Sequence, residues 1–290
     1  MNYSIENELI KVSVKSKGAE LSSYFNKNLN TEYVWQADPK FWGKHAPILF
    51  PVIGKVFNDT IKVGGKSYPM VKHGFGRDME FEMRNQQAES IEFSLRADEQ
   101  TKQSFPFDFE LVVRYELKGS VLITNFIIKN KGAEKMYFSI GGHPAFNCPI
   151  EKDDVLENCF IEFSSMEKDD KVLINMDGYR NGNIVKDYIN GKSIQLTKDI
   201  FKHDALIFLN LKSKELAIKS KISSKSLKFS HKGFPHLGIW APVGAPFVCL
   251  EPWHGVCDSI GYTGELKDRF GNVGLEAQKE YACSYSIEGI

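Results

Sequence analysis

The sequence lacks an excess of charge of either sign. Its 290 residues carry 37 Lys and Arg against 37 Asp and Glu, which gives a net charge of zero at pH 7. Proteins that bind nucleic acid or anionic membranes usually carry an excess of basic residues, at least on one face. We therefore expect neither a nucleic acid nor a membrane as a partner.

Cysteine motifs and long apolar runs are also missing. The five cysteines are an odd number and form no Cys-x-x-Cys pair, which argues against a disulfide framework and a zinc ribbon. No stretch approaches the roughly 18 consecutive apolar residues that a membrane-spanning helix needs. The first residues, MNYSIENELIKVSVKS, lack the basic and apolar regions of a signal peptide. We expect reduced thiols in a cytoplasmic protein.

No apolar stripe of helical spacing continues over three turns, and alternation with a period of two dominates instead. Such alternation is typical of half-buried strands. The longest example is Phe109–Leu117, where every second residue is apolar and most of the others are polar. The other predicted strands are Ile10–Lys15, Met79–Arg84, Ile91–Arg96, Val121–Lys129, Phe160–Phe163, Ala205–Leu211, Leu216–Lys219, Leu227–Ser230, Leu237–Trp240, Val248–Glu251 and Tyr281–Ile287.

Turn signals separate these strands, and few helices are expected. The signals are Gly64-Gly65, Lys118-Gly119-Ser120, Lys131-Gly132, Asn181-Gly182 and Asn190-Gly191. Short helical turns are predicted only near Asp38–Trp42 and Asp98–Gln103. Because no linker or repeat divides the chain, we predict one all-β domain over residues 1–290, a large antiparallel β-sandwich.

Five segments break the alternation by placing ionisable groups among glycine, proline and aromatic residues, as functional sites often do. They are Trp42–Lys55, Lys72–Asp78, Ser139–Asn147, His203–Phe208 and Val248–His254. In the third segment two glycines precede His143, and we interpret them as the site of a sharp bend that Pro144 then fixes. In the fifth, Glu251 shares a strand face with Phe247 and Cys249. We therefore expect the Glu251 carboxylate to point inward, where it needs a hydrogen-bond or ion-pair partner or a functional role.

Each of these residues also has a purely structural interpretation. A single histidine near a strand end usually lies at the surface or is hydrogen-bonded in the core. Arg77 could form a salt bridge, Asp204 a turn, and Trp253 part of the core. Residue types taken singly leave both interpretations open.

Three motifs, taken in order, resemble the aldose 1-epimerase family. They are His-Gly-Phe-Gly-Arg at 73–77, Gly-Gly-His-Pro-Ala-Phe at 141–146 and Leu-Glu-Pro-Trp at 250–253. The chain looks most similar to compact bacterial galactose mutarotase-like proteins, and the likeness covers most of its length. The resemblance implies a large twisted β-sandwich with an open sugar cleft on one sheet.

The resemblance also implies roles for individual residues. His143 matches the histidine that acts as general acid on the sugar ring oxygen. Glu251 matches the glutamate that acts as general base on the anomeric hydroxyl. His73 matches a second histidine that holds and polarises the sugar, and Asp204 matches an aspartate that binds sugar hydroxyls.

The chain departs from galactose mutarotases at one position upstream of His73. Where those proteins carry an arginine, this chain has Lys55, which lacks the bidentate fork of arginine. Arg77 is expected to compensate. Trp253 and Phe146 are expected to stack on the apolar face of the sugar.

The implied chemistry is the opening and closing of a pyranose ring. A base removes the proton of the C1 hydroxyl while an acid protonates the ring oxygen. The C1–O5 bond then breaks, the aldehyde rotates, and closure gives the other anomer. No metal, nucleotide cofactor or covalent intermediate is needed, and the sequence offers no phosphate-binding loop. Glycoside hydrolysis is a rival chemistry, but it typically needs two carboxylates.

We therefore predict a cofactor-independent aldose 1-epimerase, an isomerase that acts on a small-molecule sugar. One alternative is a hexose 6-phosphate mutarotase, with Lys55, Lys72 and Arg77 as phosphate contacts. Another is a non-catalytic carbohydrate-binding protein with the same fold, and a third is an interaction sandwich without a sugar site. A monomer and a homodimer are both compatible with the sequence.

Overall fold

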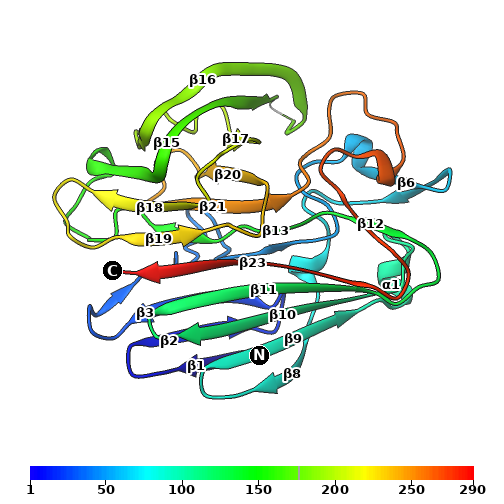
Figure 1. The fold of residues 1–290 in the computed structure, drawn as a ribbon, viewed down its shortest axis with the longest axis horizontal. Coiled ribbons are helices and arrows are strands. Elements are labelled where there is room, and N and C mark those ends of the chain that lie inside the picture. Colours follow the sequence, from blue (N-terminus) through cyan, green and yellow to red (C-terminus); the bar gives the residue numbers. More distant parts are fainter. Residues whose placement is uncertain (176) are drawn as a thin grey trace.

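The structure is a computed structural model that describes residues 1–175 and 177–290, and antiparallel strands dominate it (Figure 1). A small sheet consists of β1 (Asn2–Glu6), β2 (Ile10–Lys15), β3 (Glu20–Asn26) and β4 (Thr31–Glu32). The large sheet runs in the order β5 (Ile48–Leu49), β13 (Ile140–Gly142), β21 (Phe247–His254), β20 (His236–Trp240), β17 (Leu206–Phe208), β15 (Cys159–Ile174), β18 (Glu215–Ser220), β19 (Leu227–Ser230), β23 (Glu280–Gly289), β11 (Val121–Asn130), β10 (Phe109–Lys118), β9 (Ser90–Arg96) and β8 (Glu82–Gln86). Beside this path, β14 (Ala145–Asn147) pairs with β21, and β16 (Arg180–Gln195) pairs with β15.

The remaining elements are short. Two ribbons are formed by β6 (Thr60–Val63) with β7 (Lys66–Pro69) and by β12 (Met136–Phe138) with β22 (Val273–Leu275). The helices of the described residues are α1 (Glu99–Lys102) and the 3-10 helices η1 (Phe57–Asp59), η2 (Gly76–Asp78), η3 (Leu156–Asn158) and η4 (Leu266–Asp268). The prediction of an all-β sandwich with few short helices is confirmed.

Alternating burial explains why most of the predicted strands form. Along β11 every second side chain is fully buried, and β10 joins it through the predicted turn at Gly119-Ser120. The small sheet covers this region, since Tyr3 of β1 packs edge-on against Phe93 of β9 at 5.4 Å between ring centroids. One core cluster extends from Ile5 to Ile287, so both ends of the chain contribute to it.

The predicted helical turns differ in outcome. Asp98 caps α1, because its side chain accepts a hydrogen bond from the Thr101 N–H at 2.7 Å. At Asp38 only a hydrogen-bonded turn forms, in which the N–H groups of Phe41 and Trp42 donate to the Asp38 carbonyl. None of the helices in the described residues has the length and apolar character that a membrane crossing requires.

Two of the predicted turns are wrong. Asn181-Gly182 and Asn190-Gly191 lie inside β16, which pairs with β15 in the long hairpin at the top of Figure 1. The register of the β15–β16 pairing shifts near Gly191, and Gly182 and Gly191 both have positive φ. The two glycines therefore mark irregularities within a bent hairpin. Most of the β16 side chains are exposed, which explains why no apolar alternation marked this strand.

Candidate active site

A cavity of about 670 Å³ lies where β21, β20 and β17 adjoin one another in the large sheet. Loops before and between these strands complete its wall. Six of the predicted site residues line it: His73, Arg77, His143, Asp204, Glu251 and Trp253. Segments far apart in the sequence therefore converge on one space that is open to solvent.

His143 and Glu251 are in contact at this cavity. The Nε2 atom of His143 lies 3.2 Å from Oε2 of Glu251, and the side chains are 8% and 2% exposed. Glu251 belongs to β21, while His143 stands in the two-residue break between β13 and β14, both of which pair with β21 in the same register. Among the described residues, the buried Oε2 atom of Glu251 accepts no hydrogen bond. The carboxylate therefore keeps an unused acceptor beside the imidazole.

Glycine at position 141 allows β13 to approach β21 closely. A Cβ atom there would lie 2.6 Å from the carbonyl oxygen of Pro252 and 2.9 Å from the ring of Trp253. Gly141 and Gly142 do not have positive φ and lie in an extended strand. The predicted sharp bend is therefore wrong, and the glycines serve close packing that brings His143 to Glu251.

Burial is the main influence on the protonation of this pair. It lowers the pKa of His143 to about 3 and raises the pKa of Glu251 well above its ordinary value. Lys72 and the indole N–H of Trp253 partly oppose the shift of Glu251, whereas Asp204 adds to it. Burial thus favours a pair that holds one proton, since a second proton would charge His143 and the loss of the proton would leave a buried carboxylate.

The tautomer of His73 follows from one backbone contact. The N–H of Gly54 donates to Nδ1 of His73 at 3.1 Å, so this nitrogen carries no proton. Burial, followed by the neighbouring His143, lowers the pKa of His73 well below its ordinary value. His73 is therefore neutral, and its Nε2–H is a hydrogen-bond donor. Its ring centroid lies 5.7 Å from that of His143.

Tryptophan side chains that the sequence analysis missed enclose His143. Trp42 stacks on its ring at 4.9 Å between centroids, and Trp240 meets it edge-on at 5.6 Å. Together with Trp253, three of the four tryptophans of the chain line the cavity. Trp42 lies far from Trp240 and Trp253 in the sequence, so the fold brings these three side chains together and no local pattern marked the cluster.

The other predicted contacts keep part of their structural roles. Arg77 donates from Nη2 to the carbonyl of Lys72 at 2.8 Å, and burial lowers its pKa. Asp204 has a positive φ and accepts from the N–H of Ala205 at 2.7 Å, as a turn residue does. Both side chains nevertheless line the cavity. Their structural contacts therefore leave both side chains facing the cavity.

Known proteins of similar sequence and structure show the family of this chain. A sequence model of the aldose 1-epimerase family matches residues 1–262. The chain belongs to the aldose 1-epimerase family. Protein LacX of Lactococcus lactis subsp. lactis, in its plasmid and chromosomal forms, is 34% identical over 281 residues, 93% of either chain.

Two solved structures share the fold of this family member throughout. A galactose mutarotase related enzyme from Lactobacillus acidophilus has a TM-score of 0.94 at 33% identity, covering 100% of this chain and 97% of that one. A galactose mutarotase-like protein from Lactobacillus casei has a TM-score of 0.94 at 31% identity, covering 100% of both chains. The fold and the family predicted from the motifs are confirmed.

Two predicted substrate contacts do not reach the cavity of this epimerase family member. Lys55 is outside the lining because its ammonium group pairs with Asp59, one turn further along the chain. Phe146 lies opposite Val248 in the β14–β21 pairing, and residues paired in this way share a face of the sheet. That face is the core, where Phe146 packs against Phe229 at 6.1 Å, while Glu251 lies on the other face.

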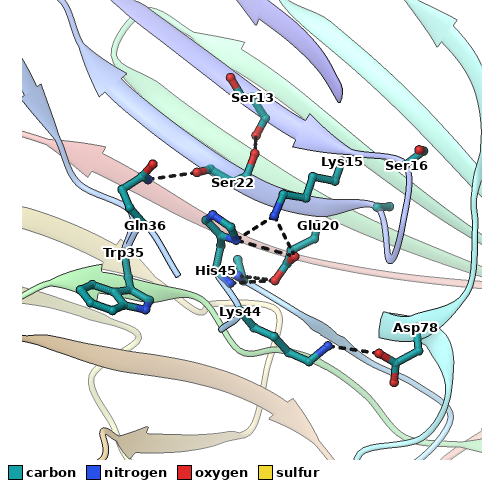
Figure 2. Close-up of polar contacts among 12 residues, drawn as sticks. Ser13, Lys15, Ser16, Glu20, Ser22, Trp35, Gln36, Lys44, His45 and Asp78 are labelled. Carbon is teal, nitrogen blue, oxygen red and sulfur yellow. Dashed lines mark hydrogen bonds and ion pairs between the residues drawn. The ribbon is translucent and has the colours of Figure 1, made fainter. Parts of the chain in front are cut away.

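A partly buried acidic residue of the small sheet, Glu20, supports the segment that precedes β5 (Figure 2). Oε1 of Glu20 accepts hydrogen bonds from the N–H groups of His45 and Ala46, at 2.8 Å and 3.1 Å. The carbonyls of segment 45–47 in turn accept from the N–H groups of Ala145 and His143. Burial raises the pKa of Glu20, but the bonds from His45 outweigh it, so the net shift is downward. Glu20 is therefore a charged acceptor that holds the segment on which His143 rests.

Proposed function

We propose that this chain is an aldose 1-epimerase in which Glu251 and His143 open and close the pyranose ring. The contact of 3.2 Å between His143 Nε2 and Glu251 Oε2 carries this proposal. The hydroxyl oxygen that loses a proton and the ring oxygen that gains one are both bonded to C1. The acid and the base must therefore be neighbours, and a histidine–carboxylate pair in contact satisfies that requirement.

The number of protons that the His143–Glu251 pair holds also suits the reaction. Ring opening takes one proton from the C1 hydroxyl and delivers one to the ring oxygen, so the pair starts and ends with the same number. A pair that holds one proton has a donor and an acceptor at once. Closure on the other face of the aldehyde uses them in exchanged roles, so neither group is consumed.

The surrounding side chains supply binding and orientation. The Nε2–H of neutral His73 is positioned as a donor to a sugar oxygen without competing for the catalytic proton. Arg77 and Asp204 are available to sugar hydroxyls, and Trp42, Trp240 and Trp253 offer apolar surfaces to the ring carbons.

The test is anomer interconversion followed by polarimetry or NMR. Freshly dissolved α-galactose, α-glucose and glucose 6-phosphate are compared with and without protein. We expect acceleration over the spontaneous rate, and a loss of roughly 10²- to 10⁴-fold in kcat/KM in Glu251→Gln and in His143→Asn. Glu110→Gln is a matched control, because Glu110 is another buried glutamate but lies on β10, outside the cavity.

The outcomes separate the alternatives. If no aldose is converted faster than it is spontaneously, the enzyme proposal fails. Sugar binding without acceleration then supports the carbohydrate-binding protein. Full activity in both variants would show that another pair does the chemistry. Circular dichroism establishes that each variant is folded before its rate is interpreted.

A phosphorylated sugar is the second candidate substrate, and the cations at the cavity favour it. Lys72, Arg77 and Lys202 all line the cavity, and Lys72 and Lys202 are exposed. Removal of Lys202 should then lower kcat/KM for glucose 6-phosphate much more than for glucose. Lys198→Ala is the control, because Lys198 is in the same loop but outside the lining. Equal effects on both sugars would contradict phosphate recognition by Lys202.

A further inference from the structure

A third side chain converges on the catalytic pair from the protein interior. One potential ligand atom from each of Cys249, His143 and Glu251 lies within 4.8 Å of the other two, and all three residues are buried. Cys249 and Glu251 are two residues apart on β21, so their side chains point to the same face of the sheet. Cys249 is paired with Ala145, two residues after His143, which brings the thiol beside the imidazole. Ring opening as derived above makes no use of this thiol.

The three donors match the preferences of one kind of metal ion. Thiolate, imidazole and carboxylate are the protein ligands of Zn²⁺, whereas Mg²⁺ and Ca²⁺ require a shell of oxygen ligands. Two anionic ligands would neutralise the charge of a divalent ion, which matters in a buried site. The Oε2 atom of Glu251 is buried and accepts no hydrogen bond from the described residues, so a ligand position is already desolvated and unused.

We propose that Cys249, His143 and Glu251 form an inhibitory Zn²⁺ site at the inner end of the cavity. Hydrated Zn²⁺ enters through the cavity and exchanges three waters for the sulfur, the imidazole nitrogen and a carboxylate oxygen. Two protons leave to solvent as the metal bonds form, one from the thiol of Cys249 and one from the His143–Glu251 pair. A fourth position stays open toward the cavity. Because the metal occupies the atoms that would act on a sugar, metal and sugar exclude one another.

Direct metal binding tests this site without relying on catalytic activity. Chelator-treated full-length protein is titrated with Co²⁺, whose bond to a thiolate gives a near-ultraviolet charge-transfer band, and with Zn²⁺ by calorimetry. We expect one equivalent and a thiolate band in the unaltered protein. In Cys249→Ala the band should vanish, and Zn²⁺ should bind more than about 100-fold more weakly, since even an outer-shell change typically costs 10- to 100-fold.

Cys257→Ala is the matched control. Cys257 is also buried and lines the same cavity, but it is outside the group of three converging ligands. Its removal should leave the Co²⁺ band and the Zn²⁺ affinity unchanged. If Cys249→Ala does not fold, Cys249→Ser keeps the volume and still removes the thiolate.

Several results would overturn the proposal. These are the absence of a thiolate band in the unaltered protein, an unchanged Zn²⁺ affinity in the folded Cys249 variant, or loss of the band in Cys257→Ala. Where mutarotase activity is present, Zn²⁺ should slow it, a chelator should restore it, and Mg²⁺ should have no effect. A protein without mutarotase activity would still give the Co²⁺ result, so the two proposals fail independently.

Discussion

Replacement of Glu20 by alanine tests how firmly the backbone holds His143. The Glu20 carboxylate accepts two hydrogen bonds from segment 45–47, whose carbonyls accept bonds of 2.8 Å and 2.9 Å from Ala145 and His143. Alanine removes the acceptor and leaves two N–H groups without a protein partner. Segment 45–47 then loses its hydrogen bonds to Glu20 of β3. His143 is in turn held less firmly, because its N–H donates to a carbonyl of that segment.

The magnitude follows from the two lost bonds. An unsatisfied buried N–H costs about 1–3 kcal/mol, so the sum is about 2–6 kcal/mol. The Glu20 side chain is 13% exposed, and water that enters in its place would satisfy part of the loss. We therefore expect a fall of about 2–3 kcal/mol in the free energy of unfolding, or about 5 °C in Tm.

The kinetic effect should be specific to the chemical step. A displacement of about 1 Å at a catalytic group can cost about 10²-fold, so kcat in Glu20→Ala should fall at least tenfold. KM should change little, because His73 and Arg77 are held by other contacts. Denaturant unfolding measures the stability, and steady-state polarimetry with a mutarotating aldose separates kcat from KM.

Glutamine at position 20 separates the acceptor from the charge. Both N–H groups donate to the same atom, Oε1, and the amide oxygen of glutamine can replace it. Glu20→Gln should therefore keep kcat near that of the unaltered protein, although it weakens the contacts to Lys15 and the ring of His45. Unchanged kcat in Glu20→Ala would refute the support role, and equal losses in both variants would show that the charge matters more than the acceptor.

Four further predictions concern the cavity. Because burial lowers the pKa of His143 to about 3, kcat/KM should stay level as pH falls through 6.5, and an acid limb near 6.5 would contradict this. The same depressed pKa makes stability fall below pH 6.5, since the unfolded histidine takes a proton that the folded one excludes; urea unfolding across pH measures it. Gly238→Ala should cost about 1–3 kcal/mol by denaturant unfolding, because a Cβ would lie 2.5 Å from the Trp253 ring. Sugar should change the tryptophan fluorescence, and Trp42→Phe or Trp240→Phe should each reduce that change.

The sequence predicts strands well where one face is buried and the other is not. Phe109–Leu117 and Val121–Lys129 form β10 and β11 almost as expected, because each alternates against a core. β16 was missed because few of its side chains are buried, so its pairing with β15 leaves no apolar period in the sequence. Asparagine–glycine pairs then suggested turns where the hairpin has irregularities instead.

Candidate site residues were predictable from the sequence where they stand in a motif, and less so where tertiary packing decides whether a side chain reaches the cavity. His143 and Glu251 both stand in motifs, and the strands β13 and β14 on either side of His143 pair with β21, which carries Glu251. Phe146 is in the same motif as His143, but strand alternation turns its ring to the opposite face. Trp42 comes from a loop before β5 and reaches His143 only through the tertiary fold, so no local pattern marked it.

The histidine in contact with Glu251 also argues against glycoside hydrolysis, which residue types alone would permit. Two carboxylates, Glu251 and Asp204, line the cavity. A glycosidase, however, places its carboxyl groups about 5–9.5 Å apart on either side of the bond, with one of them as the proton donor. Here Glu251 is instead in contact with His143, at 3.2 Å. We therefore expect no release of nitrophenol from nitrophenyl glycosides. If nitrophenol is released, and if both Glu251→Gln and Asp204→Asn abolish this release, the protein is a hydrolase and the ring-opening mechanism is refuted.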